Sequence, residues 1–332
     1  MADSDIEPDT EPGCVPPREI TSLLGHVDAV RAFDQLQQAG RLHHAWMIAG
    51  PKGVGKASLA YYLAGKLLAG GEAARQKIRA QAHPNLLTIR RPWDDKRKRW
   101  KAEITIDEVR KVPEFYSRSA GEAGWRIAII DSMDELNNNA SNALLKTLEE
   151  PPSKGLLFLL THSPGRLLPT VRSRCRRLDL RPPPREESKN WLVEQHGVGP
   201  ADADAALDMA NGAPGRALAL ARSGALGLEK DIAELMALLP QWDTQRSRRL
   251  AAKVSVKTGE SLRPQFFSAL TRLAAHRARE AAAAGQSPDA WLQAWQHLKG
   301  LASEADDIYL DPKQAALAAL AQIEHAAREA RR

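Results

Sequence analysis

A glycine-rich loop constrains the fold of this 332-residue chain more than any other feature. Residues 50–56 read Gly-Pro-Lys-Gly-Val-Gly-Lys, after an apolar run at 45–49 and before a helical pattern at 58–69. A strand, a glycine-rich turn and a helix in this order are typical of a P-loop. Its backbone N–H groups surround phosphates, and its lysine reaches the β and γ oxygens. The predicted nucleotide-binding residues of this loop are Gly50, Gly53, Gly55 and Lys56.

Strands and helices alternate along residues 19–181. Apolar runs at 127–130 and 156–161 predict two more buried strands, and 85–89 and 103–106 predict strands joined by a charged connection. Helices are predicted over the following ranges: 107–117 and 140–150. This alternation predicts an α/β domain with a mostly parallel sheet covered on both faces.

The chain divides into further regions by composition. Prolines at 182–184 follow the α/β region, and short helices of a small domain are predicted over 182–226. Longer amphipathic segments over 227–332 predict an all-α domain large enough to fold alone. Residues 1–18 are acidic and proline-rich, without the basic start and apolar core of a signal or transit peptide, so we predict a disordered tail.

The loop lacks two parts of a site that hydrolyses ATP. Lys56 is followed by Ala57, where a Ser or Thr hydroxyl normally ligates Mg²⁺. Asp131, at the end of a predicted strand, fits the acidic position of the metal site, but Ser132 stands where a hydrolysing site needs a glutamate. We therefore predict a scaffold loop without hydrolysis, and the sequence leaves open whether ATP or ADP still binds.

Two further motifs carry a specific resemblance. Residues 142–152 read Asn-Ala-Leu-Leu-Lys-Thr-Leu-Glu-Glu-Pro-Pro, and residues 173–175 read Ser-Arg-Cys. With the P-loop, they make the chain resemble the clamp-loader branch of the AAA+ ATPases, and within it the delta-prime subunits of bacterial DNA polymerase III. Over about residues 19–330 the resemblance implies a RecA-like AAA+ P-loop domain, a small helical lid and an all-α C-terminal collar for oligomerisation.

The resemblance also implies roles for single residues. Thr161 matches a polar nucleotide sensor, and Leu24-Gly25-His26 flank the adenine pocket. Gly215 stands where hydrolysing subunits carry a sensor arginine, and Arg216 is one residue late. Arg174 matches an arginine finger that acts in trans on the ATP of a neighbouring subunit. The alternative for Arg174 is a surface salt bridge.

The resemblance implies a stator subunit that needs no cofactor and has no catalytic activity of its own. Its expected partners are gamma/tau motor subunits and a delta subunit, and the assembly would load a sliding clamp on primer–template DNA within the DNA-directed DNA polymerase III holoenzyme, a nucleotidyltransferase complex. Many relatives carry a four-cysteine zinc module, but residues 70–83 have no cysteine, so no zinc is expected. The alternative is a self-sufficient clamp-loader ATPase motor subunit, against which Ala57, Ser132 and Gly215 argue.

The composition restricts the cellular compartment and the kinds of partner that we expect for this chain. Two cysteines cannot form a disulfide framework, and no apolar stretch is long enough for a membrane span, so we expect a cytoplasmic protein. The net charge is +6, and the basic run 90–101 contains Trp93 and Trp100. This run is interpreted either as a contact for phosphates and bases or as a solvated hairpin tip. The second interpretation is the simpler one, and DNA contact stays open.

Overall fold

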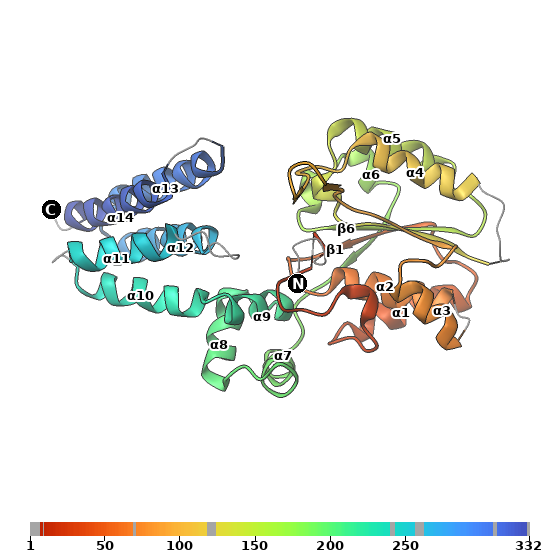
Figure 1. Ribbon diagram of the computed structural model, residues 1–332, viewed down its shortest axis with the longest axis horizontal. Helices are drawn as coiled ribbons and strands as arrows, with labels where there is room; N and C mark the ends of the chain where they lie inside the picture. Colours follow the sequence, from red (N-terminus) through yellow and green to blue (C-terminus); the bar gives the residue numbers. More distant parts are fainter. Residues whose placement is uncertain are drawn as a thin grey trace. The chain divides into compact units, whose positions relative to one another are not determined.

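The computed structural model describes residues 7–8, 10–68, 71–117, 124–239, 243–255, 262–307 and 311–330, without the side chains of 302–307. The chain forms two compact units, Met1–Ala219 and Leu220–Arg332. Figure 1 shows the α/β elements of the first unit and the helices of the second.

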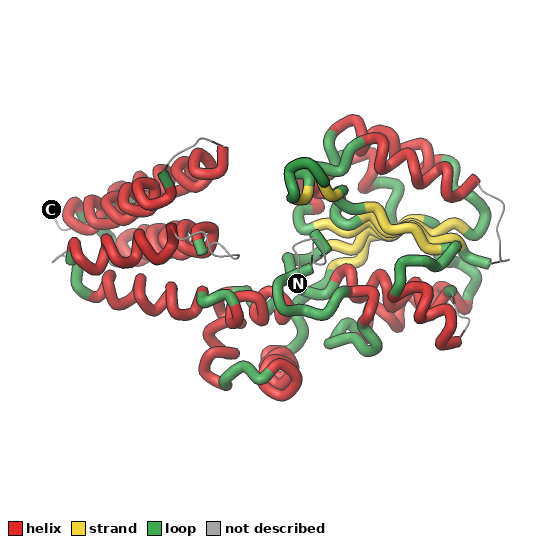
Figure 2. The backbone as a smooth tube through the Cα atoms, in the orientation of Figure 1, coloured by secondary structure: helices red, strands yellow, loops and turns green. Residues whose placement is uncertain are grey.

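A five-stranded parallel sheet organises the first unit, as predicted. The strand order is β2-β5-β6-β1-β7, and each neighbouring pair runs parallel. Figure 2 shows the sheet in yellow between two layers of helices. All parallel strands end at the same edge, so residues that follow β1, β5 and β6 meet there. The strands are β1 (Ala45–Ala49), β2 (Leu86–Ile89), β5 (Arg126–Ile130), β6 (Gly155–Thr161) and β7 (Arg176–Asp179).

Alternate strand residues supply two hydrophobic cores, because successive side chains of a strand point to opposite faces. Trp46 and Ile48 belong to one core, together with residues of α1, α2 and α3. Met47 belongs to the other, together with residues of α4, α5 and α6. The two helix layers lie on opposite faces of the sheet (Figure 1). The helices are α1 (Val27–Gln38), α2 (Lys56–Leu67), α3 (Gly71–Arg79), α4 (Ile106–Ser117), α5 (Asn138–Glu149) and α6 (Pro169–Arg172).

The structure differs from the predicted strands at two places. The strand predicted over 103–106 is a single bridge between Ile104 and Leu136, and the basic run holds a hairpin of β3 (Trp93–Asp94) and β4 (Arg99–Trp100). Strand β7 was not predicted. It is an edge strand with mostly charged residues, so its sequence lacks the apolar run that identifies β1 and β6.

The remaining elements are helical. In the first unit, α7 (Arg185–Asn190) continues into a π-helical turn (Trp191–Gln195), followed by α8 (Pro200–Met209) and α9 (Pro214–Arg222), which ends beyond the unit boundary. In the described residues of the second unit, five helices surround a core that includes Phe266 and Leu320. They are α10 (Ala225–Ala237), α11 (Thr244–Ser255), α12 (Arg263–Ala283), α13 (Asp289–Asp307) and α14 (Pro312–Glu329). Among the described helices, none has the length and apolar character needed to cross a membrane.

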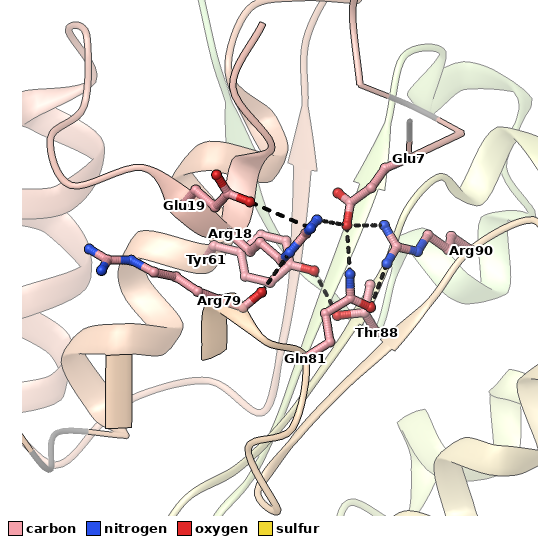
Figure 3. A network of polar contacts seen from close by, with 8 residues as sticks. All are labelled: Glu7, Arg18, Glu19, Tyr61, Arg79, Gln81, Thr88 and Arg90. Atoms are coloured by element: carbon pink, nitrogen blue, oxygen red, sulfur yellow. Dashed lines mark hydrogen bonds and ion pairs between the residues drawn. The ribbon is translucent and has the colours of Figure 1, made fainter. Parts of the chain in front are cut away.

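The structure describes a segment of the predicted tail, which we call the N-terminal strap (residues 7–8 and 10–18). The carboxylate of Glu7 forms ion pairs with Arg18 and with Arg90 at 2.6 Å, and it accepts a hydrogen bond from Gln81 at 2.7 Å (Figure 3). The structure thus places an acidic side chain of the strap against basic partners of the folded unit, and the disorder of the tail stays a prediction.

Candidate functional site

The glycine-rich loop joins β1 to α2 at the edge where the parallel strands end. Gly53 and Gly55 have φ angles of +76° and +101°, which favour glycine, and Gly55 is the N-cap of α2. Lys56 is the first residue of α2 and is only 5% exposed. Its Nζ donates hydrogen bonds to the carbonyl oxygens of Gly50 at 2.8 Å and Pro51 at 2.9 Å. The ammonium group therefore binds the carbonyls of its own loop.

Burial changes the protonation of Lys56. Removal from water lowers the pKa of its ammonium group to about 8, and the nearby carboxylates of Asp131 and Asp134 oppose this shift. At neutral pH the group still carries most of its positive charge. The site is thus a partly desolvated cation at the end of a buried strand.

Asp134 accepts several hydrogen bonds near the loop, although no role is predicted for it from the sequence. It belongs to a short 3-10 turn (Met133–Glu135) that follows β5. Its carboxylate accepts hydrogen bonds from the Thr161 hydroxyl at 3.1 Å and from the N–H groups of His162 and Ser163 at 2.6 and 2.9 Å. Asp134 therefore holds the end of β6, and the proposed sensor hydroxyl of Thr161 donates to Asp134.

The protonation states around Asp134 follow from these contacts. Burial alone would raise the pKa of Asp134, but the His162 N–H and the other donors outweigh it and lower that pKa below its usual value. Burial, with the charge of Lys56, lowers the pKa of His162 to about 4. At neutral pH the pair is therefore an anionic carboxylate and a neutral imidazole.

Ser132, at the position where a hydrolysing site needs a glutamate to activate water, has a buried hydroxyl with a structural role. Ser132 is fully buried, and its Oγ donates to Asp134 at 3.0 Å. Ala57 lines the cavity beside Lys56 and has no oxygen on its side chain. The arrangement thus lacks the carboxylate and the hydroxyl that phosphoryl transfer to water requires at these positions.

The start of α9 packs directly on the glycine-rich loop. The N–H of Gly215 donates to the carbonyl of Gly53 at 3.0 Å, and a Cβ on Gly53 would lie 2.3 Å from the nitrogen of Arg216. The Arg216 guanidinium lies 3.2 Å from the Glu11 carboxylate of the N-terminal strap. Arg216 therefore faces the strap, and Gly215 brings the loop and α9 into backbone contact.

Two cavities border this loop. The smaller, of about 100 Å³, lies on the side of Lys56, where a P-loop is expected to hold phosphates, and is lined by Gly53, Gly55, Lys56 and Asp131 together with strap residues. The larger, of about 480 Å³, is lined by Leu24, His26 and Trp191, among others. The structure therefore brings together four of the predicted binding residues, and Gly50 and Thr161 join them through the contacts with Lys56 and Asp134 described above.

Arg174 lies apart from these residues and lines neither cavity. It follows α6, its Nη1 donates to the carbonyl of Thr170 at 3.0 Å, and its Nη2 pairs with Glu149 at 2.8 Å. The surface salt bridge considered for Arg174 is thus present. The adjacent Cys175 is half-buried, and burial raises the pKa of its thiol to about 12, which argues against a nucleophilic role.

The basic run forms an ordered turn. Trp93 and Trp100 meet edge to face with ring centroids 5.2 Å apart, and the Asp94 carboxylate accepts hydrogen bonds from the N–H groups of Lys96 and Arg97 at 3.0 and 3.1 Å. The basic side chains of residues 96–99 are exposed. This geometry fits a solvated hairpin tip and leaves the question of DNA contact open.

Comparison with known proteins supports the resemblance. Residues 25–184 match the sequence model of the family described as DNA polymerase III, delta subunit. The chain is similar to DNA polymerase III subunit delta' of Escherichia coli strain K12 (37% identity over 192 residues, 55% of this chain and 56% of that protein). It is also similar to subunit delta' of Pseudomonas aeruginosa (32% identity, 55% of this chain and 57% of that protein).

The predicted resemblance of this chain to delta-prime subunits is thus confirmed over about half of the chain. The match likewise spans about half the length of these relatives. Among solved structures, the chain is similar to a gamma subunit-related protein from Thermotoga maritima, with 18% identity and a TM-score of 0.47 over 89% of this chain and 99% of that one.

The metal prediction concerns the segment before β2. Residues 71–79 form α3, and the buried His83 accepts a hydrogen bond from the N–H of Asn85 at 3.1 Å. In the part of the chain that the structure describes, no three His, Cys, Asp or Glu side chains gather as metal ligands. The expected absence of zinc stays a prediction.

Proposed function

We propose that this chain is the stator, or delta-prime, subunit of a bacterial DNA polymerase III clamp loader. In this role it assembles in the cytoplasm with gamma/tau motor subunits and a delta subunit to load the sliding clamp on primed DNA. It supplies Arg174 to the ATP of a neighbouring motor subunit and does not hydrolyse ATP itself.

One observation carries this proposal. The loop site of the chain has Ala57 and a buried Ser132 where hydrolysis needs a metal-binding hydroxyl and a carboxylate, while Arg174 lies outside that site and is 36% exposed. A guanidinium on the surface can reach a phosphate bound by another subunit, where it would stabilise the charge that develops on the transferred phosphoryl group.

The experiment is ATP turnover by the purified chain, first alone and then with motor and delta subunits, clamp and primed DNA. We expect no turnover by the chain alone. In the assembly, Arg174→Ala should lower turnover at the adjacent site by about a thousandfold. Arg172→Ala, which removes an exposed arginine two residues away, is the matched control and should leave the rate unchanged.

Two results would contradict the proposal. An assembly with Arg174→Ala that keeps the full DNA-stimulated rate would remove the finger role. Turnover by the isolated chain would instead favour the alternative of a self-sufficient motor subunit, because its own loop would then have to supply the hydrolytic groups.

A further inference from the structure

The N-terminal strap brings a buried carboxylate to the glycine-rich loop. Glu11 is 7% exposed, and its Oε2 lies 3.2 Å from Nη1 of Arg216. Its other oxygen, Oε1, is buried and has no hydrogen-bond partner. Glu11 lines the small cavity on the phosphate side together with Lys52 and Lys56. A carboxylate with a free acceptor therefore lies among three cationic side chains.

The charges around Glu11 are those that a phosphate would meet. The Glu11 carboxylate opposes the fall of the Lys56 pKa caused by burial, so the two side chains interact electrostatically. Backbone N–H groups at the start of α2, next to Gly55, add the positive end of a helix dipole. An anion is favoured at this position, and the chain itself provides one.

Contacts on both sides hold Glu11 in place. Toward the N-terminus, the carbonyl of Pro8 accepts a hydrogen bond from Arg91 at 2.9 Å, and Glu7 binds the cluster shown in Figure 3. Toward the C-terminus, Cys14 Sγ donates to the Gly215 carbonyl at 3.6 Å, and Arg18 donates to the carbonyl of Arg79 at 2.7 Å. A group tethered in this way has an effective concentration on the order of millimolar.

We propose that the N-terminal strap is an internal ligand of the glycine-rich loop. The Glu11 carboxylate occupies the position of a nucleotide phosphate, and the strap excludes nucleoside diphosphates and triphosphates until it is displaced. The strap closes the phosphate side only, since the larger cavity keeps about 480 Å³ on the side of Leu24 and Trp191. This inference goes beyond the stator role and does not depend on it.

The test is binding of a fluorescent ADP analogue to the isolated chain, measured by anisotropy. Two variants should bind the analogue with a Kd lower by about tenfold or more: Glu11→Ala, and a variant without residues 1–16. In both, the nucleotide no longer competes with the strap for the loop. Glu72→Ala, which removes an exposed carboxylate outside both cavities, is the matched control and should bind as the wild-type chain does.

The increase in affinity for the ADP analogue must depend on the glycine-rich loop itself. Lys56→Ala combined with Glu11→Ala should return the Kd to the wild-type value. Equal affinity of the wild-type chain and both strap variants, with thermal melts showing that each is folded, would overturn the proposal.

The wild-type chain gives a test even if the strap variants do not fold. With millimolar ADP, amide hydrogen exchange over residues 10–15 should become faster, since nucleotide and strap cannot occupy the loop together. Unchanged exchange over residues 10–15, while ADP protects residues 53–56, would also overturn the proposal.

Discussion

Arg174 is held by Glu149, the last residue of α5, through an ion pair of 2.8 Å between Nη2 and Oε1. The side chains of the two residues are 36% and 51% exposed. Exposed ion pairs of this kind contribute about 0–1 kcal/mol to folding. Arg174 can therefore exchange Glu149 for a phosphate oxygen at little cost, while the hydrogen bond to Thr170 keeps the guanidinium oriented.

Substitution at this pair should leave the fold intact. We expect Arg174→Ala and Glu149→Gln each to change the free energy of unfolding by less than about 1 kcal/mol, because both groups remain hydrated. Urea unfolding followed by circular dichroism measures this. A loss of several kcal/mol from Arg174→Ala would instead indicate a structural role and would undermine any assignment of Arg174 to ATP turnover.

The buried ammonium group of Lys56 predicts a pH dependence of stability. Its pKa falls from 10.5 in the unfolded chain to about 8 in the folded one, so between these values the unfolded chain binds more protons and stability rises with pH. Below pH 8 both states are protonated, and the cost of burying the charge is constant.

We therefore compare the free energies of unfolding of Lys56→Met and the wild type at two pH values. The difference should favour the variant by about 3 kcal/mol more at pH 7 than at pH 10.5. Urea unfolding at both pH values gives the difference. Lys52→Met, which removes an exposed charge from the same loop, is the control. If the stability difference between Lys52→Met and the wild type changes by the same amount between the two pH values, the pH dependence does not come from the buried ammonium group of Lys56.

The sheet and the loop were predictable from the sequence because their signals are local. Strands β1, β5 and β6 are continuous apolar runs, since both of their faces are buried, and the glycines of the loop stand directly after β1. Strand β7 carries Arg176, Arg177 and Asp179 and pairs on one side only, so nothing in its own sequence distinguishes it from a charged turn.

The site was predictable only in part because its remaining contacts join distant segments. Asp134 contacts Thr161 at the end of β6, and these two residues are 27 positions apart in the sequence. Glu11 contacts Arg216, and that pair is 205 positions apart. An acidic residue just after a buried strand was the available signal for Asp134. For Glu11 no local pattern exists, because a proline-rich acidic segment is equally typical of a disordered tail.

Asp134 should matter for stability more than its position in a short turn suggests. Asp134→Ala removes the acceptor of four hydrogen bonds, from Ser132, Thr161, His162 and Ser163. We expect the free energy of unfolding at pH 7 to fall by about 1–3 kcal/mol. Because the pKa of Asp134 is lowered in the folded chain, its contribution is present above pH 3.8 and is lost on further acidification.

Urea unfolding at pH 7 and near pH 3 measures this contribution. Asp95→Ala, in the exposed hairpin turn, is the control and should change the free energy of unfolding by less than about 0.5 kcal/mol. If Asp134→Ala is as stable as the wild type at pH 7, then water replaces the carboxylate at the end of β6 without lowering the free energy of unfolding.

The contact between the glycine-rich loop and α9 gives a test based on backbone geometry. Gly53 and Gly40 both have positive φ angles, +76° and +65°, so alanine at either position costs about 1–2 kcal/mol of backbone strain. Gly40 has open space around its Cβ position, whereas a Cβ on Gly53 would lie 2.3 Å from the backbone nitrogen of Arg216. Alanine at position 53 must therefore also push α9 away from the loop.

We expect Gly53→Ala to lower the free energy of unfolding by at least about 1 kcal/mol more than Gly40→Ala, since overpacking adds to the strain. Urea unfolding compares the two variants, and amide exchange at Gly215 reports whether its hydrogen bond to Gly53 is lost. If both alanine variants lose the same stability and Gly215 stays protected, then the loop and α9 do not pack as closely as this contact requires.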